Sequence, residues 1–332
     1  MKAALALLLS GVGLAQTWAP QPSGTTASLR GVSAVNARVV WAGGTKGTFL
    51  RTTDGGAAWR AATLPHAEDL DFRGVRAFDE RMAFLLSSGP GDKSRIYRTN
   101  DAGATWQLQF TNPDPTGFFD AVAFWDRDHG MVLGDPVNGH FVVLTTGDGG
   151  RNWTRQETPP ALEKEAAFAA SNTCLFVLGK SEAWFGTGGP GGARVFHSTD
   201  RGRTWTAAAT PVRNDGPSAG IFSLAFRDRK HGIAVGGDYA KPDDSLRNSA
   251  TTPDGGRTWS SAGAPAGFRS AVAFLRDAAI WIAVGTSGSD SSADGKTWRR
   301  FDAGAYNAVS FVSSEAGWAV GPNGRVAKFR LK

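Results

Sequence analysis

The chain has 332 residues, with 36 Lys and Arg against 30 Asp and Glu, which gives a formal net charge of +6. It contains 43 Gly, 12 Trp and a single Cys. One Cys excludes an internal disulfide framework and a Cys-x-x-Cys redox or haem motif. Cys174 lies in the apolar run TCLFVL, so we expect a buried strand residue rather than a reactive thiol.

Residues 1–15 have the features of a secretory signal peptide. Lys2 supplies a positive charge, Ala3 to Leu9 are apolar, and Gly13-Leu14-Ala15 offers a small-residue cleavage site before Gln16. The apolar run is too short to span a bilayer, so we expect no transmembrane segment. The chain is therefore expected to be exported, to the periplasm or the medium, where nucleic acid is not an expected partner.

A short motif then recurs six times. Its copies are TTDGGAAW, TNDAGATW, TGDGGRNW, STDRGRTW, TPDGGRTW and SADGKTW, with aspartates Asp54, Asp101, Asp148, Asp200, Asp254 and Asp294. These positions are 47, 47, 52, 54 and 40 residues apart. A period of roughly 40–50 residues with β-rich flanks indicates a propeller or a solenoid.

Each motif residue has a predicted structural role. The Asp carboxylate is expected to accept hydrogen bonds from backbone N–H groups of the following turn. Gly permits the positive φ that a chain reversal needs. The Trp is expected to begin the next strand and to bury its ring. The six aspartates are therefore interpreted as structural rather than catalytic.

The same order of strands is expected around every motif. An inner strand is predicted at 29–34, 72–78, 119–125, 166–171, 222–226, 269–274 and 307–311. A second strand is predicted at 39–44, 82–87, 130–135, 183–188, 232–237, 281–285 and 317–321. Short apolar runs bounded by Gly are typical of buried strands. A third strand leads into the motif, and the motif Trp begins the fourth.

This pattern gives seven inner strands but only six motifs. The seventh unit ends at RVAKFRLK (325–332) without a motif or a fourth strand. Gln16-Thr17-Trp18 repeats the Thr-Trp with which a fourth strand begins. We therefore predict an all-β fold, a seven-bladed β-propeller over residues 16–332, with the ring closed by the N-terminal strand, which leaves no long exposed edges.

The motif resembles the Asp-box, or bacterial neuraminidase repeat, of the sialidase-like superfamily. The motif series, with second strands such as GWAVG (317–321), resembles the photosystem II stability/assembly factor family, and FAASNT (168–173), WFGTGG (184–189), SAGIFSLAF (218–226) and GGDY (236–239) resemble its bacterial branch. Plant and cyanobacterial members of that family are exported, non-catalytic assembly chaperones that bind membrane-protein partners, partly through an arginine patch. The resemblance implies an exported, non-catalytic scaffold that binds a protein partner. We expect a monomer without a cofactor.

The alternative is a carbohydrate-active enzyme of the sialidase-like glycosidase type, or a glycan-binding protein. Sialidases need three arginines, a Tyr–Glu pair and an acidic Asp, and their Arg-Ile-Pro signature is absent here. A glycosidase would need two carboxyls about 5–9.5 Å apart, drawn from Asp120, Asp135, Glu165 or Asp238. No Gly-x-Gly-x-x-Gly stands in a strand–helix context, and no acidic loop has calcium-loop spacing, so neither a nucleotide cofactor nor a metal is predicted.

Two surfaces are candidates for ligand or partner binding. At one end of the central channel, the channel face, we expect the connections from fourth to inner strands and from second to third strands. The residues predicted there are Arg30, Arg73, Asp120, Asp135, His140, Glu165, Asp238, Tyr239, Arg269 and Tyr306. The motifs lie at the opposite end, the turn face. There the residue two before the motif Trp is basic in four consecutive blades, which predicts a basic arc formed by Arg151, Arg203, Arg257 and Lys296. Such an arc could attract an acidic protein, an anionic lipid or a polyanionic glycan.

Overall fold

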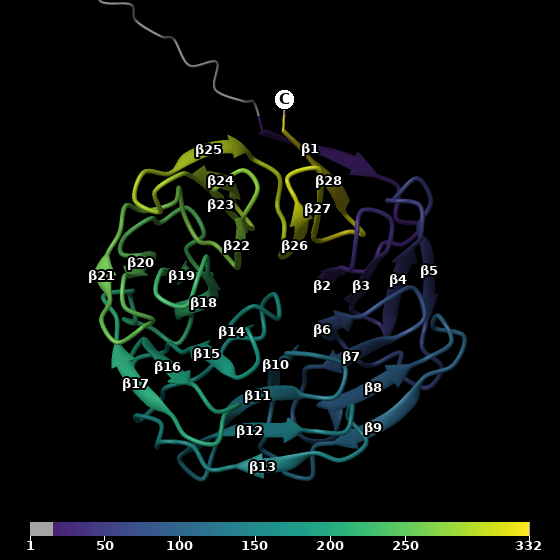
Figure 1. Cartoon of the computed structure of the whole chain (residues 1–332), viewed down its shortest axis with the longest axis horizontal. Coiled ribbons are helices and arrows are strands. Elements are labelled where there is room, and N and C mark those ends of the chain that lie inside the picture. The colour runs from purple at the N-terminus through teal and green to yellow at the C-terminus, as the bar shows by residue number, and fades with distance from the viewer. Residues whose placement is uncertain (1–15, 332) are drawn as a thin grey trace, which may run out of the picture.

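The computed structural model describes residues 16–331. Figure 1 shows a ring of seven sheets around a central channel, and each sheet has four antiparallel strands. The predicted all-β, seven-bladed propeller is therefore confirmed. The predicted signal peptide lies outside the described residues. Within them, no helix is both long enough and apolar enough to span a membrane.

The blades are numbered from the inner strand nearest the N-terminus. The inner strands are β2 (Leu29–Ala34), β6 (Phe72–Ala77), β10 (Phe119–Phe124), β14 (Leu175–Leu178), β18 (Ala219–Phe226), β22 (Ala271–Leu275) and β26 (Ala308–Ser313). The second strands are β3 (Val40–Gly44), β7 (Ala83–Ser87), β11 (Gly130–Val137), β15 (Glu182–Gly186), β19 (Gly232–Asp238), β23 (Ile280–Gly285) and β27 (Ala316–Val320). The third strands are β4 (Thr48–Thr52), β8 (Arg95–Thr99), β12 (His140–Thr146), β16 (Arg194–Ser198), β20 (Ser249–Thr252), β24 (Gly288–Ser292) and β28 (Val326–Leu331). The outer strands are β5 (Arg60–Thr63), β9 (Gln107–Thr111), β13 (Thr154–Gln156), β17 (Thr206–Ala209), β21 (Ser260–Ser261), β25 (Arg299–Asp302) and β1 (Gln16–Gln21), and one 3-10 turn, Gly91–Lys93, precedes β8.

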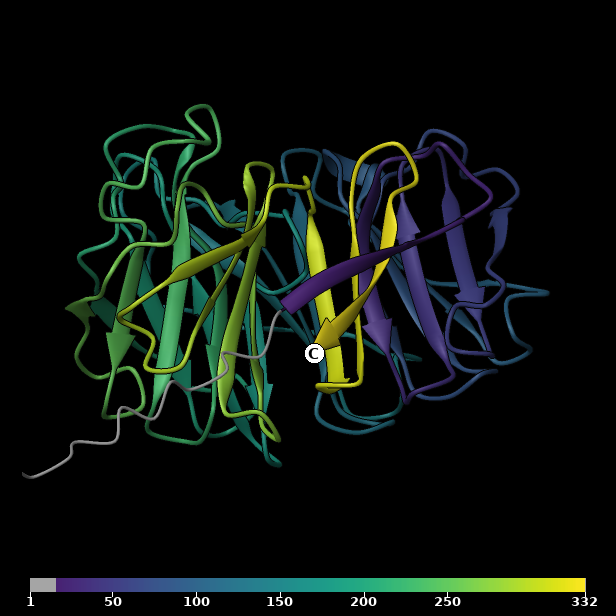
Figure 2. The same ribbon diagram turned by 90° about the horizontal axis from the view of Figure 1, so that it is seen from above.

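The ring closes as the sequence predicts. Strand β1 pairs with β28, with Trp18 opposite Phe329. In Figure 2 the purple β1 lies beside the yellow β28, so the two ends of the described chain share one sheet. Trp18 is buried, and its Nε1 donates a hydrogen bond to Ser289 Oγ of blade six at 3.0 Å. The closing strand therefore also ties blade seven to its neighbour.

The prediction for the inner strand of blade four is wrong. Residues 166–171 do not join the ladder, and the inner strand β14 begins only at Leu175. Ala166 instead forms an isolated bridge with Gly188, which in turn bridges to Gly220 of blade five. At Asn172 the chain takes a φ of 70° before it enters β14. Residues 166–170 therefore line a cavity at the channel face instead of extending a sheet. Cys174 is buried, as predicted, but it lies just before β14.

The predicted role of the motif aspartates is confirmed. In the five full-length motifs, Oδ1 of the Asp accepts the backbone N–H four residues later, as Asp148 does from Asn152 at 3.0 Å. The backbone N–H of Asn152 is the main cause that lowers the pKa of Asp148 to about 2. All six turns connect a third strand to an outer strand, at the end of the ring opposite the second-to-third connections.

Polar side chains tie the inner strands of neighbouring blades together. Ser33 Oγ of blade one accepts the N–H of Ala77 of blade two at 3.0 Å, and Ser310 Oγ of blade seven accepts the N–H of Ala34 at 2.9 Å. Similar bonds join blades three and four through Asn172, and blades five and six through Ser223. Apolar clusters fill the space between the sheets. The hydrogen bonds between neighbouring blades are directional, so they fix the positions of the strands that surround the channel.

Candidate functional site

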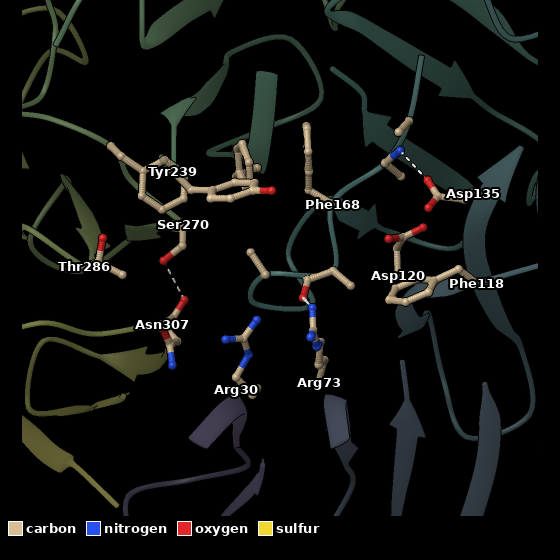
Figure 3. Close-up of a pocket in the computed structure, with 16 residues that line it drawn as sticks. Arg30, Arg73, Phe118, Asp120, Asp135, Phe168, Tyr239, Ser270, Thr286 and Asn307 are labelled. Carbon is tan, nitrogen blue, oxygen red and sulfur yellow. Dashed lines mark hydrogen bonds between the residues drawn. The ribbon is translucent and has the colours of Figure 1, made fainter. Parts of the chain in front are cut away.

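A cavity of about 570 Å³ lies at the channel face. All seven blades contribute to it, from their inner strands, from second strand β11 and from the connections at this end of the ring. The side chains shown in Figure 3 fall into three groups with different chemistry: arginines, carboxyls and aromatic rings. The lining residues are Arg30, Arg73, Phe118, Asp120, Asp135, residues 166–170, Phe222, Tyr239, Phe268, Ser270, Thr286 and Asn307.

The arginine group consists of Arg30 from β2 and Arg73 from β6, which point into the cavity from adjacent blades (Figure 3). Arg73 Nε donates to Asp71 Oδ2 at 2.7 Å, and its Nη1 donates to the carbonyl of Ala169 at 3.1 Å. Arg30 Nε is buried and has no hydrogen-bond partner among the described residues. Burial lowers the pKa of Arg30, and the positive charge of Arg73 lowers it further. An anion bound here would therefore be stabilised by a cation that the fold leaves incompletely satisfied.

The carboxyl group consists of Asp120 and Asp135 on the neighbouring strands β10 and β11 of blade three, where Phe119 pairs with Gly134. Asp120 is 1% exposed, and its Oδ2 has no hydrogen-bond partner in the described part of the chain. Burial, with a smaller contribution from the charge of Asp135, raises the pKa of Asp120 well above its usual value. Asp135 Oδ1 accepts the N–H of Ala167 at 2.9 Å, while burial raises its pKa to about 6. The pair is therefore prepared to hold a proton or to receive a cationic group.

The aromatic group forms the third wall. Phe168 stacks on Phe222 with ring centroids 4.0 Å apart, and Phe268 meets Phe222 edge-on at 4.7 Å. Tyr239 also meets Phe222 edge-on, at 6.0 Å, and is 54% exposed. An apolar group that entered the cavity would therefore contact a rigid aromatic surface.

Five of the ten residues predicted at the channel face line this cavity: Arg30, Arg73, Asp120, Asp135 and Tyr239. The other five do not. His140 is exposed at the β11–β12 turn, where Nδ1 is 2.7 Å from the carbonyl oxygen of Thr158. Asp238 is buried at the end of β19 and accepts the N–H of Ala240.

The remaining three have structural partners. Glu165 is buried and accepts hydrogen bonds from Arg194 Nε at 2.9 Å and from Thr187 Oγ1. Arg269 is completely buried and donates from Nε to Asp290 Oδ2 at 2.6 Å. Tyr306 is buried against Trp18, with ring centroids 5.4 Å apart. These side chains stabilise the channel face from beneath instead of facing a ligand.

The cavity also contains residues that were not predicted as site residues. Phe168 and Phe222 were predicted only as inner-strand positions, because an apolar run does not reveal which of its members faces the channel. Asn307 Nδ2 donates to the carbonyl of Leu29 at 2.8 Å, and Ser270 Oγ donates to the carbonyl of Asn307 at 2.7 Å. Phe118, Phe268 and Thr286 lie in connections that were predicted at the channel face, but none of the three was predicted as a site residue.

The four residues of the predicted basic arc are all exposed. Arg151 Nη1 donates to the carbonyl of Asp148 in its own turn at 3.2 Å, and Arg203 Nε donates to that of Asp200 at 3.0 Å. These two basic side chains thus lie next to their motif Asp, and hydrogen bonds within the turns favour the ionised form of those two carboxyls. The two carboxylates reduce the net positive field of the arc at Arg151 and Arg203.

Across residues 16–331, no three His, Cys, Asp or Glu side chains are grouped so that they could hold a metal ion.

Comparison with protein-family models and with curated proteins finds no match. Among solved structures, one described as YCF48 bound to D1 peptide has a TM-score of 0.64 at 16% identity, over 95% of this chain and 96% of that chain. The structure of YCF48 from Cyanidioschyzon merolae has a TM-score of 0.66 at 18% identity, over 94% of this chain and 98% of that chain. At these identities the similarity establishes a shared fold along nearly the whole chain.

Proposed function

We propose that this chain is an exported, non-catalytic β-propeller scaffold, a bacterial relative of the photosystem II assembly factors, that binds a segment of a protein partner at its channel face. The observation that carries the proposal is the cavity lined by all seven blades, in which Arg30 offers an unpaired, buried N–H group. One protein of the same fold, YCF48, has been solved bound to D1 peptide. The N-terminal segment 1–15 supports export, to the periplasm or the medium, where the chain acts as a monomer.

The surface around the cavity also favours a protein partner. Five large apolar side chains are exposed in the described part of the chain, and three of them belong to channel-face connections. Leu162 lies between β13 and β14, whereas Tyr239 and Leu246 lie in the long connection between β19 and β20. Tyr239 lines the cavity, and the two leucines lie in connections at the same end of the ring. Exposed apolar side chains on one face are typical of protein interaction sites.

The glycosidase alternative has less support. Glu165 forms an ion pair with Arg194, and Asp238 is buried at the end of β19, where it accepts the N–H of Ala240. Asp120 and Asp135 remain, but Figure 3 shows them next to each other on one wall instead of on opposite sides of a substrate space. Of the three tyrosines, only Tyr239 reaches the cavity.

The proposal is tested by affinity capture from the native envelope fraction with wild-type protein and with Arg30→Met. Because Arg30 Nε has no internal partner among residues 16–331, this substitution is expected to leave the fold intact. We expect recovery of the partner to fall by at least tenfold, since the charged contact is lost. Arg203→Met on the turn face is the matched control and should recover as much partner as the wild type.

Partner loss with Arg203→Met but not with Arg30→Met would contradict the proposal and would place the interface on the basic arc. Absence of any partner, combined with turnover of a glycan by the wild type, would favour the glycosidase alternative.

A further inference from the structure

The cavity combines both signs of charge with an apolar wall. Arg30 and Arg73 occupy one side, and Asp120 and Asp135 lie on the adjacent side (Figure 3). The aromatic residues Phe168, Phe222 and Phe268 complete the lining. A ligand that satisfies all three walls must therefore carry a negative group, a positive group and an apolar body.

Internal hydrogen bonds distinguish the polar side chains that need a ligand from those that do not. Ser270 and Asn307 donate to backbone carbonyls, and Asp71 Oδ2, next to the lining, pairs with Arg73, while Asp71 Oδ1 has no partner in the described part of the chain. Two buried atoms of the lining have no partner among residues 16–331, namely Arg30 Nε and Asp120 Oδ2. Buried polar groups are normally hydrogen-bonded, so an unpaired donor and an unpaired acceptor in one cavity indicate a ligand that is missing from both.

The signs of these two atoms restrict the chemistry of the ligand. A purely anionic ligand would satisfy Arg30 and leave Asp120 buried without a partner. A purely cationic ligand would do the reverse. A group with both charges pairs each wall, and its positive group would favour the ionised form of Asp120 over the protonated form.

We propose that the cavity binds a small zwitterion with an apolar side chain, namely a free amino acid or a short peptide. Its carboxylate is held by Arg30 with Arg73, and its ammonium group by Asp120 with Asp135. Its side chain packs against Phe168 and Phe222. The volume of about 570 Å³ lies within the range of small-ligand pockets, about 300–1,000 Å³. This inference uses the cavity of the proposed function but does not require a protein partner.

Isothermal titration of the purified chain with four probes tests the inference. L-phenylalanine and glycyl-L-phenylalanine carry both charges, N-acetyl-L-phenylalanine lacks the ammonium group, and L-phenylalaninamide lacks the carboxylate. We expect at least one of the two zwitterions to bind, and both blocked probes to bind at least tenfold more weakly. The zwitterion that binds more tightly shows whether the site selects a free amino acid or a peptide.

Two variants test which side chain binds each charged group of the ligand. With Asp120→Asn, the affinity for the zwitterion should fall at least tenfold, while that for N-acetyl-L-phenylalanine should stay unchanged. With Arg30→Met, the affinity for the zwitterion should again fall at least tenfold, but the affinity for L-phenylalaninamide should stay unchanged. Asp135→Asn serves in place of Asp120→Asn if thermal melting shows that the latter does not fold.

Equal binding of the zwitterion and N-acetyl-L-phenylalanine would overturn the inference, because it would show a site for anions alone. Failure of all four probes to bind at millimolar concentration would also overturn it. Because this titration contains no partner, failure here leaves the affinity-capture result unaffected, and the two proposals fail separately.

Discussion

Replacing Trp18 by alanine is expected to lower the free energy of unfolding by about 3–5 kcal/mol, the usual cost of removing a buried Trp side chain. Trp18 is 7% exposed, and its ring lies 5.3 Å from that of Phe329 and 5.4 Å from that of Tyr306. Its Nε1 also bonds to Ser289 in blade six. The substitution therefore weakens both the closing sheet and its contact with the next blade. Denaturant unfolding followed by circular dichroism measures the change.

Thr17 provides the matched control for Trp18. It lies in the same strand and pairs with Arg330, but its side chain is exposed. Thr17→Ala should change the free energy of unfolding by less than about 0.5 kcal/mol, as is usual for a surface position. If both substitutions had the same small effect, β1 would not hold the ring closed.

Replacing Asp290 by alanine is expected to cost about 3–5 kcal/mol of stability, because it leaves the guanidinium of Arg269 buried without its counter-ion. Arg269 is 0% exposed and Asp290 1% exposed. Arg269 also donates to the carbonyls of Phe268 and Ala266. The ion pair thus fixes the backbone beside Phe268 and Ser270, two residues of the cavity lining.

A double substitution separates the loss of a partner from the loss of packing. Arg269→Met with Asp290→Leu removes both charges and keeps apolar volume, so it should recover most of the stability lost in Asp290→Ala. Denaturant unfolding of the three proteins measures this recovery. If Asp290→Ala were as stable as the wild type, the buried pair would not contribute to the channel face.

The sequence predicts the architecture well because each blade repeats the same physical pattern. Second strands such as GWAVG are buried on both faces, so they appear as continuous apolar runs bounded by Gly. The motif Asp and Trp mark the start of each outer strand from blade one to blade six. The same regularity located the missing strand, because Thr17-Trp18 carries the signature that the seventh unit lacks.

The pattern fails in blade four because composition does not distinguish a strand from a channel lining. Residues 166–171 are as apolar as the other inner strands, and their position between two motifs is correct. What decides their conformation is the close backbone approach of Gly188 and Gly220 and the positive φ of Asn172. Such contacts between blades have no periodic signal in the sequence.

The candidate site is predicted only in part for a related reason. The alternation of strands and connections places Arg30, Arg73, Asp120 and Asp135 at the correct end of the channel. It does not reveal that Glu165 pairs with Arg194 in a third strand. Pairing between polar residues on different strands depends on three-dimensional register, so buried structural ions and ligand-facing ions have the same appearance in the sequence.

Photo-crosslinking in the native envelope fraction tests the central claim most directly, namely that partners bind at the channel face. A benzoylphenylalanine residue is introduced at Tyr239, which is exposed beside the cavity, or at Arg203, which is exposed on the turn face. We predict a crosslinked protein from position 239 and none from position 203. A crosslink from position 203 alone would contradict a channel-face interface.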